Sequence, residues 1–112
     1  MSLAIGSVTI NCSDPERLGA FWSAVLGTSV QGSSADFVFL KRPPRGGPFV
    51  VLQRVPETRV GTNRMHIDLT GEPRTDAVAR LTSLGALVAE HKEAGTGWTV
   101  MADPEGNQFC VS

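Results

Sequence analysis

Residues 4–12, Ala-Ile-Gly-Ser-Val-Thr-Ile-Asn-Cys, decide the fold of this chain because apolar and polar side chains alternate along them. Successive side chains of a β-strand point to opposite faces, so Val8, Ile10 and Cys12 would share one face and the polar residues between them the other. We therefore expect a strand with one face covered by another element. Its polar face would meet solvent or line a cavity.

A helix is expected directly after this strand. Asp14 offers an N-cap and Pro15 suits the first helical position. Apolar residues then recur at helical spacing until Gly27, which favours a C-terminal stop after about three turns. Short β-like runs follow at about 28–31, 36–41 and 48–55, separated by turn residues. The first half is thus predicted to be βαβββ.

The same order of elements begins again near residue 64. Along Met65–Thr70 the side chains of His66 and Asp68 would share a polar face. A second helix is expected at about 73–84 with Gly85 as its stop. The remaining strand candidates are 86–90, 99–102 with Trp98 at its edge, and 108–111.

Ser7 and His66 occupy matching places in the two halves, at an offset of 59 residues. Two repeats of this length are too few for a solenoid and favour a paired arrangement. We predict a single α+β domain over 1–112. Module one would span about 4–55, a linker about 56–63, and module two about 64–112. Their mixed sheets would form a curved half-barrel with the helices outside, and the polar strand faces would line one pocket.

Composition narrows the classes of function. Ten Lys and Arg against eleven Asp and Glu give a net charge of -1, with no basic stripe for a phosphate backbone, so nucleic acid is not expected as a partner. The apolar runs are far shorter than the ~20 residues of a membrane span, and we expect a cytoplasmic protein. Cys12 and Cys110 are too few for a disulfide framework and are expected to be free thiols.

Four fragments together carry a family resemblance. They are Ser7-Val-Thr-Ile-Asn-Cys-Ser-Asp-Pro15, Phe21-Trp22 with Leu26-Gly27, His66-Ile-Asp-Leu69, and Asp103-Pro-Glu-Gly-Asn107. In this combination the chain resembles a glyoxalase-like domain of the vicinal-oxygen-chelate superfamily, which includes glyoxalases, bleomycin resistance proteins and dioxygenases. The resemblance covers nearly the whole chain and implies two βαβββ modules around a small-molecule pocket.

The resemblance also implies positions for a divalent metal. In metal-dependent members His, Glu or Gln side chains on the first and last strands of the modules hold the ion, which then polarises the substrate. These positions fall on Ser7, Gln53, His66 and Cys110. His66 matches the usual ligand and Gln53 is an acceptable oxygen donor, so these two would bind a metal if one is present. The usual ligand set is incomplete, because a hydroxyl and a thiol stand at the other two positions.

Each candidate side chain also has a structural interpretation. His66 is a catalytic or metal-binding candidate, or a strand histidine bonded to a neighbour. Cys110 is a pocket thiol or a buried inert one, and Trp98 is a pocket wall or a packed indole. His91 is expected in a solvated loop, and 103–107 in a tight turn. The predicted pocket residues are Ser7, Asn11, Gln53, Asp68, Trp98 and Cys110, with His66 as the catalytic candidate.

Two classes of function remain open at this point. One is a glyoxalase-like protein that binds a small metabolite and, if it is an enzyme, performs lyase, isomerase or dioxygenase-type chemistry. The alternative is a non-catalytic protein that sequesters a small molecule, as antibiotic-binding members do, without metal. Within the first class, metal-free acid/base catalysis by His66 on a bound ring compound is a further alternative. The resemblance further implies a homodimer, in which a partner would protect exposed sheet edges.

Overall fold

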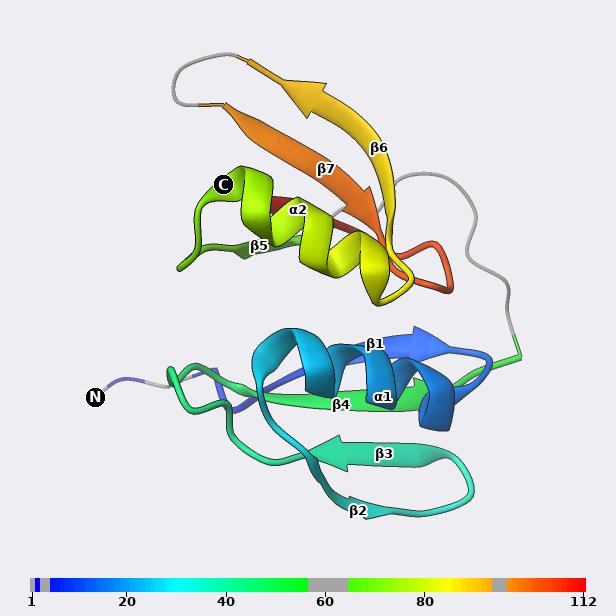
Figure 1. The fold of residues 1–112 in the computed structure, drawn as a ribbon. Coiled ribbons are helices and arrows are strands. Elements are labelled where there is room, and N and C mark those ends of the chain that lie inside the picture. The colour runs from blue at the N-terminus through cyan, green and yellow to red at the C-terminus, as the bar shows by residue number, and fades with distance from the viewer. Residues whose placement is uncertain (1, 3–4, 57–64, 94–96) are drawn as a thin grey trace. The chain divides into compact units, whose positions relative to one another are not determined.

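The computed structural model describes residue 2 and residues 5–56, 65–93 and 97–112. The chain divides into two compact units, Met1–Thr58 and Arg59–Ser112. Each unit contains one βαβββ sequence of elements, so the predicted α+β class and module order are confirmed (Figure 1). The expected strand start at residue 4, the linker from residue 57 on and the module start at residue 64 lie outside the described residues.

Module one contains the strands β1 (Ser7–Cys12), β2 (Val30–Ser33), β3 (Phe37–Leu40) and β4 (Phe49–Arg54), with α1 (Pro15–Leu26) after β1. The sheet order is β1-β4-β3-β2. The first strand runs parallel to the last, and the other pairs are antiparallel. All five predicted elements are present, and the ends of β2, β3 and β4 differ from the predicted bounds by one or two residues.

The ends of α1 follow the expected local chemistry. The Asp14 side chain accepts a hydrogen bond from the backbone N–H of Arg17 at 3.2 Å, which satisfies a donor in the first turn. Pro15 is the first helical residue. Gly27 adopts φ 66°, the left-handed conformation that glycine adopts without a Cβ penalty, and this ends the helix.

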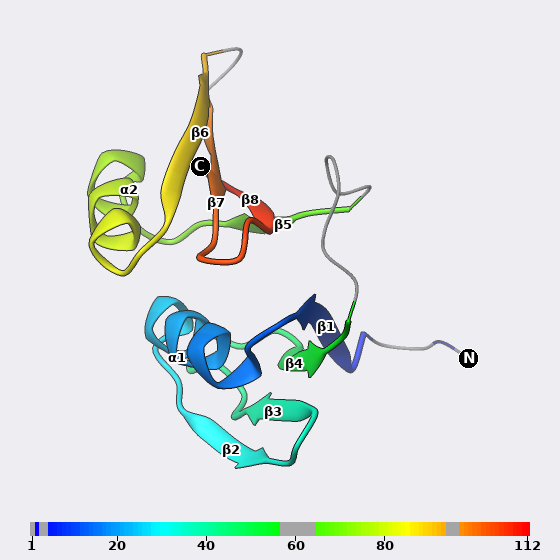
Figure 2. The same ribbon diagram turned by 90° about the vertical axis from the view of Figure 1, so that its right-hand side faces the viewer.

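The core of module one lies between α1 and one face of its sheet (Figure 2). The helix contributes the buried side chains of Leu18, Phe21 and Trp22. The facing strands contribute Cys12, Val38, Leu40, Val50 and Leu52. Full burial of one such side chain stabilises the fold by roughly 1.5–3 kcal/mol. On the opposite face Ser7, Thr9 and Asn11 are exposed, so the predicted alternation along β1 is confirmed.

Gly19 of α1 lies close against Val38 of the sheet. A Cβ at this position would lie 2.9 Å from Cγ1 of Val38, nearer than real Cβ contacts allow. We expect Gly19→Ala to lower the free energy of unfolding by about 1–3 kcal/mol, because the helix must move off the sheet. Urea denaturation would measure the change. Gly32→Ala is the matched control, since its Cβ would meet nothing within 4 Å; equal stability of both variants would contradict this packing.

Module two contains β5 (Ile67–Leu69), α2 (Arg74–Ser83), β6 (Leu87–Lys92), β7 (Trp98–Ala102) and β8 (Gln108–Val111). The sheet order is β5-β8-β7-β6, and again the first and last strands are parallel. α2 covers one face of this sheet (Figure 2). The buried core consists of Ala77, Leu81, Ala86, Met101, Phe109 and Val111. In the described part of the chain neither helix is long and apolar enough to span a membrane.

One expectation for module two was wrong. His91 does not lie in a loop but in β6, which continues to Lys92. Its Nδ1 lies 2.9 Å from the hydroxyl of Thr99 on the neighbouring strand. The polar residues after Glu90 resemble a loop in sequence, yet an edge strand tolerates such residues because much of its surface meets water. Both cysteines are free, as expected.

The segment 103–107 forms the predicted turn between β7 and β8. Asp103 is 2% exposed. Its Oδ1 accepts hydrogen bonds from the backbone N–H groups of Glu105 and Asn107, both at 2.9 Å, and its Oδ2 accepts from Nδ2 of Asn107 at 2.9 Å. The carboxylate therefore works as the structural centre of the turn.

We expect Asp103→Ala to lower the free energy of unfolding by about 1–3 kcal/mol, because it leaves partly buried N–H groups without their acceptor. Asp103→Asn would lose less, since one side-chain oxygen remains. Asp36→Ala, in an exposed turn of module one, is the control. Thermal unfolding followed by circular dichroism would rank the three variants. A loss for Asp103→Ala no larger than that of the control would contradict the structural role.

Candidate functional site

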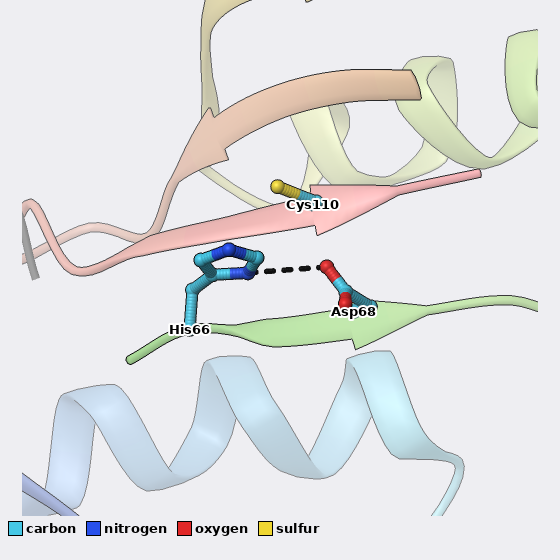
Figure 3. A group of neighbouring side chains, drawn as sticks. All are labelled: His66, Asp68 and Cys110. Atoms are coloured by element: carbon cyan, nitrogen blue, oxygen red, sulfur yellow. Dashed lines mark ion pairs between the residues drawn. The ribbon is translucent and has the colours of Figure 1, made fainter. Parts of the chain in front are cut away.

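Three side chains that can bind a ligand or a metal gather on the open face of the module-two sheet. His66 directly precedes β5, Asp68 lies within β5, and Cys110 lies in β8. Asp68 is the register partner of Cys110 in the parallel pair. Figure 3 shows His66 and Asp68 extending from β5 toward the strand that carries Cys110. The fold thus brings together residues that are more than 40 positions apart.

The three side chains are close enough to act as one group, called here the His66 cluster. Nδ1 of His66 lies 3.1 Å from Oδ1 of Asp68. One nitrogen, one carboxylate oxygen and the sulfur all lie within 4.8 Å of one another. The side chains of His66 and Asp68 are 49% and 69% exposed, whereas Cys110 is only 8% exposed. The cluster is therefore an accessible polar pair beside a buried thiol.

Burial and the Asp68 carboxylate both act on the thiol of the cluster. Burial raises the pKa of Cys110 above its usual value of 9.0, and the charge of Asp68 and a hydrogen bond to it raise this pKa further. A thiol with a raised pKa stays protonated near neutral pH and is a weak nucleophile. The arrangement therefore argues against Cys110 as an activated nucleophile and for a thiol that donates to Asp68.

Asp68 also orients the imidazole of His66. A carboxylate beside Nδ1 favours the tautomer that carries its proton on Nδ1, which leaves the lone pair on Nε2. A neutral, oriented imidazole of this kind can accept a proton, accept a hydrogen bond or ligate a metal. With the two other members, the cluster offers nitrogen, oxygen and sulfur donors in one place.

Trp98 lies on the same face of the sheet as Cys110. Val100 is the register partner of Cys110, and Trp98 is two residues away from Val100 along β7. The indole is partly buried. Farther along this face Glu90 and Lys92 form an ion pair at 2.8 Å. Trp98 thus borders the cluster side of the sheet without belonging to the cluster.

The predicted site residues of module one do not all come together. Asn11 and Gln53 are register partners on β1 and β4. Ser7 instead pairs with Phe49, four residues along the strand from Gln53, which corresponds to roughly 13 Å. Ser7 and Gln53 therefore cannot contact the same small ion within module one. Asn11 and Gln53 form a polar pair on the open face.

Sequence reasoning missed an aromatic group on this open face. The rings of Phe37 and Phe39 stack with centroids 5.7 Å apart and planes 18° apart. Phe39 is 43% exposed. The guanidinium of Arg42 lies 4.6 Å from the centroid of Phe49. The available signal was the alternation in Phe37-Val-Phe39, which puts both rings on one face of a strand.

A family model for the glyoxalase-like domain matches residues 7–112. The chain belongs to the glyoxalase-like domain family. This bears out the resemblance found in the sequence, and the match includes every residue of the His66 cluster. No curated protein sequence matches the chain.

Solved structures show the same fold. A glyoxalase/bleomycin resistance protein/dioxygenase family enzyme from Burkholderia phytofirmans PsJN is 19% identical, with 97% of both chains covered and a TM-score of 0.80. A superfamily member from Sphaerobacter thermophilus DSM 20745 is 25% identical, covering 98% of this chain and 96% of its own, with a TM-score of 0.71. A mutant fosfomycin resistance protein from Listeria monocytogenes was solved in complex with Mn(II) and a dihydroxypropylphosphonic acid. It is 14% identical, with 99% of this chain and 89% of its own chain covered and a TM-score of 0.79.

The strand registers of this glyoxalase-like domain define which residues correspond between the modules. Asp68 pairs with Cys110 in module two, as Thr9 pairs with Val51 in module one. The offset of 59 between Ser7 and His66 therefore relates Val51, and not Gln53, to Cys110. The module-one residues that correspond to His66, Asp68 and Cys110 are therefore Ser7 and Thr9, which carry hydroxyls, and the apolar Val51. Among the described residues, the His66 cluster carries the donors that suit a metal ion.

We expect Asp68→Asn to lower the pKa of the Cys110 thiol, because the substitution removes the negative charge that opposes ionisation. Burial would still hold this pKa above that of an exposed thiol. The absorbance of the thiolate, at about 240 nm, would be measured against pH and would report the shift. The protein would be treated with a chelator, and a Cys12→Ser background would remove the signal of the second thiol. Glu90→Gln on the same sheet face is the control. An unchanged titration in Asp68→Asn would contradict the coupling.

Proposed function

We propose that this glyoxalase-like protein binds a small oxygen-bearing metabolite at the His66 cluster. The observation that supports this most directly is the convergence of three donor types within 4.8 Å on an open sheet face. The thiol can donate a hydrogen bond, the carboxylate can accept one, and the imidazole can do either. A ligand with hydroxyl or carbonyl oxygens suits this set, whereas an entirely apolar molecule would leave it unpaired.

The chemistry that fits such a site is lyase or isomerase chemistry, in which a bound oxygen is polarised and a proton is moved. His66 is the residue on which we expect turnover to depend, because its ring is accessible and oriented by Asp68. The fosfomycin resistance protein binds an oxygen-rich phosphonic acid on the same fold. This analogy supports the ligand class only, since one fold hosts many reactions.

Sequestration without turnover is the second candidate function. The stacked pair Phe37 and Phe39 favours it, because an exposed aromatic face holds an apolar or planar ligand without any reactive group. The polar pair Asn11 and Gln53 lies on the same face of this sheet. Analysis of the bound compound by nuclear magnetic resonance after incubation would separate the two, since only catalysis alters it.

A thermal-shift screen with hydroxy acids, diols, dicarbonyls and phosphonates tests the proposed binding. A ligand at about 100 times its Kd stabilises the native state by about 2.7 kcal/mol, which raises Tm by several degrees. We expect His66→Ala to abolish the shift, and His91→Ala, in the same module, to retain it. No hit in the panel, or a full shift in His66→Ala, would contradict binding at the cluster.

We also propose a cytoplasmic homodimer. Support for the dimer comes from the edge strands of the two sheets, which carry exposed apolar side chains. Val30 on β2 is 46% exposed, and Leu87 and Val88 on β6 are 69% and 41% exposed. Edge strands of this kind favour a protecting partner. Light scattering coupled to gel filtration would give the mass of the assembly.

A further inference from the structure

The open face of the module-one sheet carries an accessible aromatic stack. Phe37 and Phe39 occupy alternate positions of β3, and their rings lie nearly parallel, with planes 18° apart. Their register partners on β4 are Gln53 and Val51. Val51 is buried beside Phe39, whose own side chain is 43% exposed. The exposed part of the Phe39 ring can therefore stack against one further planar group.

The stack of the two rings follows the direction of β3. Residues two apart in a strand are separated by about 6.6–6.8 Å, and the two ring centroids lie 5.7 Å apart. A third ring that continued the stack past Phe39 would lie over the next position of this face, residue 41. The backbone N–H of Lys41 donates to the carbonyl of Ser29 at 2.8 Å, so the strand pairing continues to this residue. Continued by one step, the register of β3 with β4 puts Lys41 opposite Phe49.

Two cations stand at this end of the aromatic face. The guanidinium of Arg42 lies 4.6 Å from the ring centroid of Phe49, and its Nη1 donates to the carbonyl of Gly47 at 3.1 Å. These two contacts hold the guanidinium in place and leave most of its five N–H donors for a ligand. Lys41 and Arg42 are both exposed. Within the described residues neither of them forms an ion pair with a carboxylate.

The carboxylates of residues 5–56 lie toward the other end of the sheet. The charged residues at that end are Asp14, Glu16, Arg17, Asp36 and Arg54, more acidic than basic. They follow the ends of β1 and β4 or precede β3, and these strand ends are neighbours because Asn11 and Phe37 both pair with Gln53. An anionic group on the open face is therefore attracted to the end with Lys41 and Arg42.

We propose that this surface, called here the Phe39 face, binds a planar aromatic acid. It consists of Phe37, Phe39, Lys41, Arg42 and Phe49. The ring of the ligand continues the stack on Phe39, and its carboxylate accepts hydrogen bonds from the two cations. The proposal names the ligand class that the second candidate function leaves open. It goes beyond the binding proposed at the His66 cluster and does not rest on it, since module one alone supplies the Phe39 face.

Titration of the full chain with three compounds tests the proposal. The compounds are 2-naphthoate, 2-naphthamide, which keeps the ring without the charge, and cyclohexanecarboxylate, which keeps the charge without a planar ring. Nuclear magnetic resonance of the valine methyl groups follows binding, because Val51 lies on the open face and Val50 on the helix face. We expect naphthoate to bind more tightly than both other compounds. Its ring current should shift the Val51 signals and leave those of Val50 in place.

Two variants and two controls identify the binding groups. Phe39→Leu keeps an apolar side chain without an aromatic face and should weaken naphthoate binding roughly two- to tenfold. The double variant Lys41→Gln, Arg42→Gln should bind naphthoate and naphthamide about equally, a loss of discrimination that general unfolding does not produce. Val30→Ala changes an apolar side chain of similar exposure, 46%, and Arg17→Gln removes a cation at the other end. Both controls should bind naphthoate as the unaltered protein does.

Three results would overturn the proposal: equal affinity of the unaltered protein for naphthoate and naphthamide, Val51 signals that do not move, or full naphthoate affinity in Phe39→Leu. Movement of the Val51 signals with protein concentration alone would show that a second copy of the chain covers the face, and would also overturn it.

A repeat of the titration with His66→Ala separates this proposal from the proposed function. Naphthoate binding that is retained in His66→Ala supports the Phe39 face, and its loss there would contradict a site within module one. Failure of naphthoate to bind the unaltered protein, together with a His66-dependent hit in the thermal-shift screen, would disprove the Phe39 face and leave the proposed function standing.

Discussion

The parallel pairing of the first and last strands of each module is the constraint on which the structure depends. β1 pairs with β4, and β5 with β8. Parallel neighbours need a long crossover, and in each module the crossover is a helix followed by two antiparallel strands. This closure covers one face of the sheet with the helix. It also brings the two ends of a module, more than 40 residues apart in sequence, side by side on the other face.

The two open faces carry different residues although the modules share one architecture. In module one the positions equivalent to Asp68 and Cys110 are Thr9 and Val51, and stacked phenylalanines lie beside them. In module two the same positions carry a carboxylate and a thiol next to an imidazole. One face is suited to apolar contact and the other to coordination or proton transfer.

The electrostatics of the His66 cluster depend on its unequal burial. Cys110 is buried, so its ionisation is opposed both by desolvation and by the nearby carboxylate. His66 and Asp68 remain accessible and form their own close contact at 3.1 Å. Removal of the negative charge should therefore alter the thiol more than the fold, which is why Asp68 is the informative position to substitute. A cation bound beside Cys110 would instead favour ionisation of the thiol, because a positive charge stabilises the thiolate.

The sequence by itself determined the order of elements, the helix ends and the two faces of each first strand. These features depend on local chemistry: the Asp14 cap, the Gly27 stop and the period of two in β1. Only the tertiary structure decided which strand residues are opposite each other. The strand register placed Cys110 beside Asp68. It also made Val51, and not Gln53, the module-one residue that corresponds to Cys110. On the neighbouring strand it brought Thr99 next to His91. Periodicity specifies a face but not a neighbour, because pairing between distant strands depends on how the whole module packs.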